Sequence, residues 1–125
     1  MNIQIKRVYD APEESDGTRI LVDRLWPRGI KKETLQLDDW AKVLAPSTEA
    51  RKAFAHKAEN FGEFKGRYEA ELDQSAEAHE YVSTLAASNP PVVTLLYAAK
   101  DPQVNHAIVL KGWLERQVGD AASCD

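Results

Sequence analysis

Residues 91–107 read PVVTLLYAAKDPQVNHA and predict a buried strand that is followed directly by a helix. The run from Pro91 to Ala99 is nearly continuous in β-branched residues and leucine, which is typical of a strand with both faces covered by helices. Asp101 is a candidate N-cap, and Pro102 occupies the first helical position, where its missing N–H costs nothing. This pattern indicates parallel strands at the centre of the fold.

Two further segments predict strands, and the intervening stretches predict helices. Residues 3–9, IQIKRVY, alternate apolar and polar side chains, as a strand with one less buried face would. Residues 18–25, TRILVDRL, form a second nearly continuous apolar run. The candidate helix starts are Ser47 as an N-cap, Asn60 with Glu63 as a capping box, and Ser75 as another N-cap.

The chain of 125 residues is expected to form one compact α/β domain over residues 1–118, with a frayed tail at 119–125. Its content of 43% hydrophobic and 29% charged residues is ordinary for a globular protein. The predicted architecture is a small, mostly parallel central sheet flanked by helices. The long connection between Pro27 and Pro46, with a short helical turn near Glu33, is typical of a functional loop.

Cysteine content and hydropathy indicate the cellular compartment in which the protein is expected. The single cysteine, Cys124, has no disulfide partner and no CxxC spacing, which fits a reducing cytoplasm. The first residues lack the basic and apolar regions of a signal peptide, and no apolar run approaches the roughly 20 residues that span a bilayer. We therefore expect a cytoplasmic protein that is not embedded in a membrane.

The net charge of −4 disfavours a protein that coats nucleic acid, because such proteins gain most of their affinity by neutralising phosphates. The basic residues are nevertheless unevenly distributed. Residues 19–32 contain five basic side chains and one acidic side chain, namely Arg19, Arg24, Arg28, Lys31, Lys32 and Asp23. A local site for an anion is therefore compatible with the acidic total.

Polar side chains gather at the ends of two predicted strands. One group lies in VDRLWPRG at residues 22–29, and the other in YAAKDPQVNHA at residues 97–107. In an open parallel sheet the carboxyl ends of the strands border one crevice, into which helix N-termini point their free N–H groups. The two groups therefore predict a single pocket, provided that both strands run in the same direction.

The residue types in this pocket predict an anionic ligand that carries a phosphate or a carboxylate. Arg24 and Arg28 offer planar guanidinium groups suited to either anion, and Arg7 and Arg51 would add to them if the fold brings them near. His106 is the candidate for proton transfer, because a histidine titrates near neutrality. The remaining candidates, which would orient the histidine or the ligand, are Asp23, Tyr97, Asp101 and Asn105.

Each of these assignments has a structural alternative. Trp26 could be a packing anchor rather than a stacking face, Asp101 could serve only as a helix cap, and His106 could be a core residue. The arginines could fix the long loop through ion pairs with Asp23, Asp38 or Asp39.

A metal site is not predicted. Asp23, Asp101 and His106 could supply ligands, but no pair of them has the fixed spacing of a motif such as HExxH or CxxC. A serine nucleophile is not indicated either, since Ser47 lacks a GxSxG elbow and is explained as a helix cap. The sequence names no cofactor.

Five segments make the sequence resemble the domain-of-unknown-function 488 family, in its short YeaO-like branch: RVYD, DGTRILVDRLWPRGIKKE, DDWAKVLAPSTEARKAF, FGEFKGRYEAEL and VTLLYAAKDPQVNHAIVL. The resemblance covers residues 3 to about 114 and implies a compact α/β domain, but no activity. A longer branch of the family carries cysteines in a pattern like LLCAEKDPxxCHR. Tyr97 and Asn105 stand at those cysteine positions and Ala107 replaces the arginine, so thiol or metal chemistry is not carried over.

Three functions fit these observations. The first is an enzyme, or the remnant of one, that acts on a small phosphorylated or nucleotide-like substrate, with His106 transferring a proton. The second is a non-catalytic module that binds an anionic ligand, a nucleic-acid strand or a protein, with Trp26 as a stacking face beside the arginines. In the third, the same residues form a buried polar network that only holds the long loop.

Overall fold

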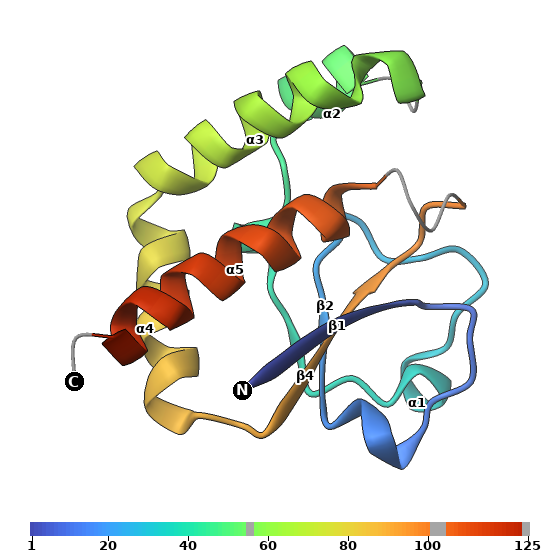
Figure 1. Cartoon of the computed structure of the whole chain (residues 1–125). Helices are drawn as coiled ribbons and strands as arrows, with labels where there is room; N and C mark the ends of the chain where they lie inside the picture. The colour runs from blue at the N-terminus through green and yellow to red at the C-terminus, as the bar shows by residue number, and fades with distance from the viewer. Residues whose placement is uncertain (55–56, 101–104, 124–125) are drawn as a thin grey trace.

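The computed structural model describes residues 1–54, 57–100 and 105–123, and within these residues four parallel strands form one sheet (Figure 1). The strand order is β1-β4-β2-β3. The strands are β1 (Asn2–Arg7), β2 (Thr18–Leu21), β3 (Asp39–Trp40) and β4 (Val92–Tyr97). The predicted α/β domain with a parallel sheet is confirmed.

The central strand of the sheet is the last one along the chain. On one side of β4, Ile3 of β1 pairs with Val93, and on the other side Ile20 of β2 pairs with Leu95. The three strands expected from the sequence are all present. The two-residue strand β3 was not predicted, because a strand of that length shows no periodicity.

The helices are α1 (Lys32–Leu35), α2 (Thr48–Phe54), α3 (Phe61–Gln74), α4 (Ala76–Ser88) and α5 (His106–Ser123), with 3-10 turns η1 (Glu14–Asp16), η2 (Lys42–Leu44) and η3 (Ala58–Asn60). Two predicted caps are confirmed, since Ser47 Oγ accepts the N–H of Ala50 and Ser75 Oγ accepts the N–H of Ala78, each at 3.1 Å. Nothing in the described part of the chain forms a helix long and apolar enough to cross a membrane.

The expected capping box at Asn60 is wrong. The side chain of Asn60 caps no helical N–H, and its Nδ2 instead donates to the carbonyl oxygen of Phe54 at 3.2 Å. The backbone of Asn60 is already helical, with φ −93° and ψ −1°, because it belongs to the 3-10 turn that leads into α3. A cap residue normally has extended backbone, so the side chain is not placed for that role.

The two faces of the sheet are covered differently, as Figure 1 shows with α2–α5 on one side and α1 on the other. Ile20 and Leu95 point into the larger core beneath the long helices. Their neighbours Leu21 and Leu96 point into a smaller core with Leu35. Helices therefore lie on both faces, as expected, but unequally, because the long connection after β2, with only the four-residue α1, covers the second face.

The amino edge of the sheet carries a buried polar network. Asp16 forms ion pairs with Lys6, at 3.2 Å, and with Arg19, whose side chain also donates to the carbonyl oxygen of Leu35. Asp16 and Arg19 are both buried. Arg19 was counted among the basic residues near the expected anion site, but it lies at the start of β2, at the opposite edge from that site.

Candidate functional site

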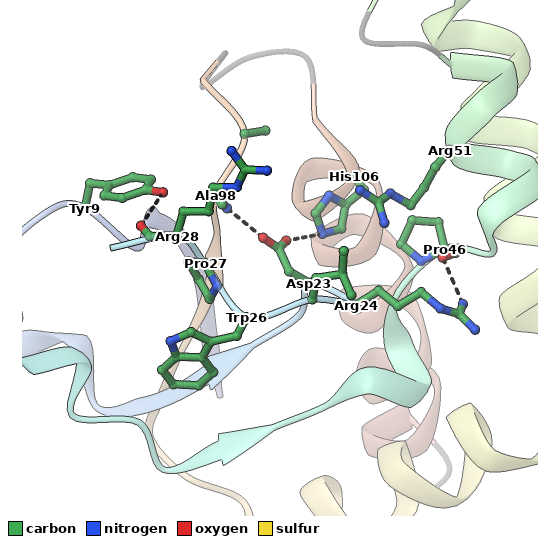
Figure 2. Close-up of a pocket in the computed structure, with 12 residues that line it drawn as sticks. Tyr9, Asp23, Arg24, Trp26, Pro27, Arg28, Pro46, Arg51, Ala98 and His106 are labelled. Atoms are coloured by element: carbon green, nitrogen blue, oxygen red, sulfur yellow. Dashed lines mark hydrogen bonds and ion pairs between the residues drawn. The ribbon is translucent and has the colours of Figure 1, made fainter. Parts of the chain in front are cut away.

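A cavity of about 350 Å³ opens at the carboxyl edge of the sheet (Figure 2). Tyr9, which follows β1, residues 23–28, which follow β2, and residues 98–99, which follow β4, all line it. Pro46 and Arg51 contribute from the start of α2, and His106 from the start of α5. The two polar groups predicted from the sequence therefore meet at one cavity.

Asp23 joins the two halves of this site. Its Oδ2 accepts the backbone N–H of Ala98 at 3.0 Å, which ties the chain beyond β2 to the chain beyond β4. Its Oδ1 lies 3.0 Å from Nε2 of His106, and its backbone carbonyl accepts the indole N–H of Trp40 at 2.7 Å. The side chain is mostly buried, with 15% of its area exposed, so Asp23 has a structural role in addition to any contact with a ligand.

His106 is the first residue of α5, and its ring is fixed through Nε2. This nitrogen lies 3.1 Å from the carbonyl oxygen of Val22 as well as 3.0 Å from Oδ1 of Asp23. Both neighbours are hydrogen-bond acceptors, so Nε2 carries a proton and donates it to the Val22 carbonyl. Nδ1 is the ring nitrogen that is left for a ligand.

Asn105 caps α5, a role that the sequence analysis did not assign to it. Its Oδ1 accepts the backbone N–H of Ile108 at 3.1 Å. The residue is buried and lines a small cavity of about 30 Å³, which shares Pro46, Arg51 and His106 with the larger one. Asp101 and Pro102, the expected cap and first helical residue, lie outside the described residues.

Three arginines line the cavity, and none of them forms an ion pair with another described residue. Arg24, Arg28 and Arg51 are all exposed. Within residues 1–54, 57–100 and 105–123 none of them forms an ion pair, although Nη1 of Arg24 approaches the carbonyl oxygen of Pro46 at 3.5 Å. The positive charges therefore remain for solvent or a ligand.

The aspartates considered as structural partners for these arginines are engaged elsewhere. Asp38 Oδ2 accepts the backbone N–H of Arg19 at 2.8 Å, and Asp39 Oδ2 accepts the hydroxyl of Tyr81 at 2.6 Å. Burial and this bond to Asp39 raise the pKa of Tyr81. The alternative in which Asp38 or Asp39 neutralises Arg24 or Arg28 is therefore not found.

Trp26 acts as a packing anchor and also lines the cavity. Its ring meets that of Trp40 edge to face, with centroids 5.4 Å apart and planes at 70°. Its indole N–H donates to the carbonyl oxygen of Ile30 at 2.8 Å, which fixes the entry to the long loop. Both contacts hold one orientation of the indole beside the cavity.

Tyr97 and Arg7 do not line the cavity. Tyr97 is still within β4, where successive side chains point to opposite faces, and it enters the larger core with 2% of its area exposed. Arg7 lies beside the cavity, where its Nε donates to the carbonyl oxygen of Ala99 at 2.9 Å and its guanidinium lies over the ring of Tyr9.

Two residues that matter to the site were not predicted from the sequence. Tyr9 lines the cavity because it follows β1, and the rule used for the other two strands would have found it. Glu71 of α3 accepts the N–H of Ser47 at 3.1 Å and also its hydroxyl, and so positions the start of α2, which carries Arg51. No pattern in the sequence links Glu71 to Ser47, because the contact is tertiary.

Tyr68 lies inside the core next to the site, with its ring centroid 6.4 Å from that of His106. Burial, with the charges of Glu71 and Asp23, raises the pKa of Tyr68 well above its usual range. Its hydroxyl donates to the carbonyl oxygen of Leu44 and stays neutral.

Among the described residues there is no group of three or more His, Cys, Asp or Glu side chains placed to hold a metal ion.

Comparisons with known proteins give relatives along nearly the whole chain. A family model described as "Inactive DUF488-N3 subclade" matches residues 2–124. The chain is 54% identical over 114 residues to "Uncharacterized protein YeaO" of Escherichia coli, which covers 91% of this chain and 97% of that protein. It is 40% identical over 108 residues to "Uncharacterized protein Rv3073c" of Mycobacterium tuberculosis, covering 86% of this chain and 89% of the relative. No solved structure matches.

Proposed function

Since the chain belongs to the inactive DUF488-N3 subclade, we propose that its cavity binds a small anionic ligand without converting it. The observation that carries this proposal is the set of three cavity-lining arginines that have no ion-pair partner among the described residues. Guanidinium groups bind phosphate and carboxylate through paired hydrogen bonds. A pocket at the carboxyl edge of a parallel sheet is also a common position for a ligand.

The arrangement around His106 supports binding rather than turnover. Its Nε2 is committed to the Val22 carbonyl, and Tyr97, which was expected to assist it, points into the core. Of the residues expected to take part in proton transfer, His106 therefore keeps Nδ1, while Tyr97 does not line the cavity. The word "inactive" in the description of the family model agrees with this view.

A second candidate, an enzyme with His106 as a general base, is favoured by the contact between Asp23 and His106. A carboxylate beside an imidazole orients the ring in many hydrolases. In this case Nδ1 would take the proton. Incubation of the protein with each ligand that binds, followed by NMR spectroscopy of the ligand over hours, separates the two functions, because only an enzyme changes the ligand.

The proposed function predicts ligand-dependent stabilisation that requires the arginines. A thermal-shift series with phosphate, sugar phosphates, nucleotides and carboxylic acids should give at least one ligand that raises the melting temperature of the unaltered protein. Arg24→Gln and Arg51→Gln should each weaken binding of that ligand about tenfold or more, since a charge-assisted hydrogen bond contributes roughly 1.5–3 kcal/mol.

Arg67→Gln is the matched control, because Arg67 is exposed on α3 and does not line the cavity. This variant should bind the ligand as the unaltered protein does. The proposal is wrong if no anion stabilises the protein, or if the Arg67 variant and the two cavity variants lose affinity equally.

A further inference from the structure

The cavity is larger than an inorganic anion requires. Its volume of about 350 Å³ lies near the lower end of the range for small-molecule pockets. It corresponds to roughly a dozen water molecules at about 30 Å³ each. A phosphate ion, with about five non-hydrogen atoms, fills less than half of that space on the same scale. A ligand held by its phosphate therefore has room for a second chemical group.

The two sides of the cavity differ in chemistry (Figure 2). Two of the three arginines, Arg24 and Arg51, lie on the side of Pro46, whereas Tyr9 lies on the opposite side with Arg28 beside it. Three large apolar side chains are exposed in the described part of the chain, and two of them, Tyr9 at 48% and Leu25 at 68%, line this cavity. Exposed apolar surface beside a pocket indicates that part of the ligand is itself apolar.

Tyr9 is held in place although it is exposed. Its hydroxyl donates to the carbonyl oxygen of Arg28 at 3.2 Å, and the guanidinium of Arg7 lies 5.2 Å from the centre of its ring. Arg7 is fixed in turn by its bond to Ala99, and Arg7 does not line the cavity. The guanidinium therefore backs the ring instead of filling the space in front of it, and the ring forms a preorganised stacking surface.

The charge of the site favours a phosphate over a carboxylate as the anionic group. A carboxylate carries one negative charge, whereas a phosphomonoester carries about −1.5 to −2 near neutral pH. Arg24, Arg28 and Arg51 bring three positive charges without an anionic partner among the described residues. A dianion compensates this excess more fully than a monocarboxylate does.

We infer that the cavity takes a phosphomonoester that carries an aromatic ring, with the phosphate between Arg24 and Arg51 and the ring against Tyr9. This chemistry is that of a nucleoside monophosphate, which has about twice as many non-hydrogen atoms as the cavity holds waters on the same scale. Its base would therefore lie at the rim of the cavity, against the exposed ring of Tyr9. The inference rests on the proposed function, since it assigns a ligand class to the same anion site. It adds a second, uncharged contact that increases affinity, namely stacking of the ligand's ring on Tyr9 on the opposite side of the cavity.

The test measures dissociation constants for adenosine monophosphate, ribose 5-phosphate, inorganic phosphate and adenosine by calorimetry. Adenosine monophosphate should bind roughly 5- to 150-fold more tightly than ribose 5-phosphate, the range expected for stacking of one base. Tyr9→Leu should remove this advantage and leave the affinity for ribose 5-phosphate unchanged. Tyr9→Phe, which keeps the ring and loses only the bond to Arg28, should retain most of it.

The outcomes separate this inference from the proposed function. Equal affinity for adenosine monophosphate and ribose 5-phosphate, with both lost in Arg24→Gln, overturns the aromatic subsite and leaves the anion site standing. A loss of both ligands in Tyr9→Leu also overturns it, because Tyr9 would then act only on the shape of the loop. If none of the phosphates binds, this inference fails, and the proposed function fails with it only if no carboxylic acid binds either. In the unaltered protein, nuclear Overhauser effects between adenine and Tyr9 protons should be present, and their absence in a saturated complex contradicts the placement of the ring.

Discussion

At the residue scale, Asp23 shows how one side chain can organise a site. It follows β2 directly, and its two oxygens reach the backbone of Ala98 beyond β4 and the ring of His106 at the start of α5. The end of β2 is thereby held against the end of β4 and the start of α5, which come 75 or more positions later in the sequence. A carboxylate used in this way is only partly available to a ligand, so the proposed binding of an anion would depend on the arginines around it.

The contacts of His106 predict its tautomer. Because Nε2 lies against two acceptor oxygens, the neutral ring should carry its proton on Nε2 and leave Nδ1 unprotonated. Nitrogen-15 NMR spectroscopy of the imidazole distinguishes the two tautomers directly. His79 is exposed, with its Nε2 2.8 Å from the carbonyl oxygen of Asp73, and serves as an internal reference. A neutral His106 with its proton on Nδ1 would contradict the geometry.

The positions of site residues could be predicted from the sequence only where they follow a strand end. Asp23, Arg24, Trp26 and Arg28 were found by that rule. Tyr97 was placed in the site wrongly by the same rule, because β4 continues through this residue and the alternation of the strand turns its side chain into the core. A shift of one residue at a strand end exchanges a site residue for a core residue, and strand ends are the least certain part of a sequence-based prediction.

At the element scale, the start of α2 connects stability to the site. Ser47→Ala should lower the free energy of unfolding by about 1 kcal/mol, because the cap of α2 is lost. It should also weaken binding of an anion, since the hydroxyl contact with Glu71 is lost and only the backbone N–H contact remains to position the helix of Arg51. Urea unfolding and calorimetric titration with the same ligand measure the two effects.

Ser75→Ala is the matched control, because Ser75 caps α4 with the same 3.1 Å bond and lies away from the cavity. Ser75→Ala should lower the free energy of unfolding by a similar amount and leave the affinity for the ligand unchanged. Equal losses of affinity in the two variants would mean that binding follows global stability and not the position of α2.

Helix caps and long strands were predictable because they depend on local chemistry. Ser47 and Ser75 each precede a run with helical periodicity, and their hydroxyls bond to N–H groups three residues ahead. The covering of the second face was not predictable in the same way. The apolar residues of the long connection, such as Leu35 and Leu37, are spaced irregularly and form a small core only in the folded chain.

At the scale of the whole molecule, the sheet has a polar network at its amino edge and the candidate site at its carboxyl edge. Asp16 is buried in this network. Burial opposes its ionisation, but hydrogen bonds from the Glu13 backbone, Lys6 and Arg19 outweigh that effect and lower the pKa of Asp16 from 3.8. For Lys6, the bonds to Glu13 and Asp16 likewise outweigh burial and raise its pKa.

The lowered pKa of Asp16 gives a pH-dependent part of the stability. This part is fully present above about pH 5, where the carboxylate is ionised in both states, and is lost as the pH falls through 3.8 and then through the lowered pKa of the folded protein. Asp16→Asn should reduce the free energy of unfolding at pH 7 by roughly 3 kcal/mol, because Arg19 is left buried without its partner.

The difference in the free energy of unfolding between the unaltered protein and Asp16→Asn should become smaller as the pH is lowered from 5 towards 2. Urea unfolding at a series of pH values gives both curves. Asp10→Asn is the control, since Asp10 is exposed and forms no ion pair among the described residues. Parallel curves for the unaltered protein and Asp16→Asn would show that the carboxylate does not contribute through its charge.

The place of β4 at the centre of the sheet has a consequence for how the protein is made. A ribosome synthesises the chain from its N-terminus, so β1 and β2 emerge long before residues 92–97. Until then β1 lacks its partner, and β2 has only the two-residue β3. The pairing of Gln4 with Thr94 spans 90 positions, a separation that slows folding. During most of its synthesis the nascent chain therefore exposes unpaired strand edges, and the cavity at the carboxyl edge forms only with the last third of the polypeptide.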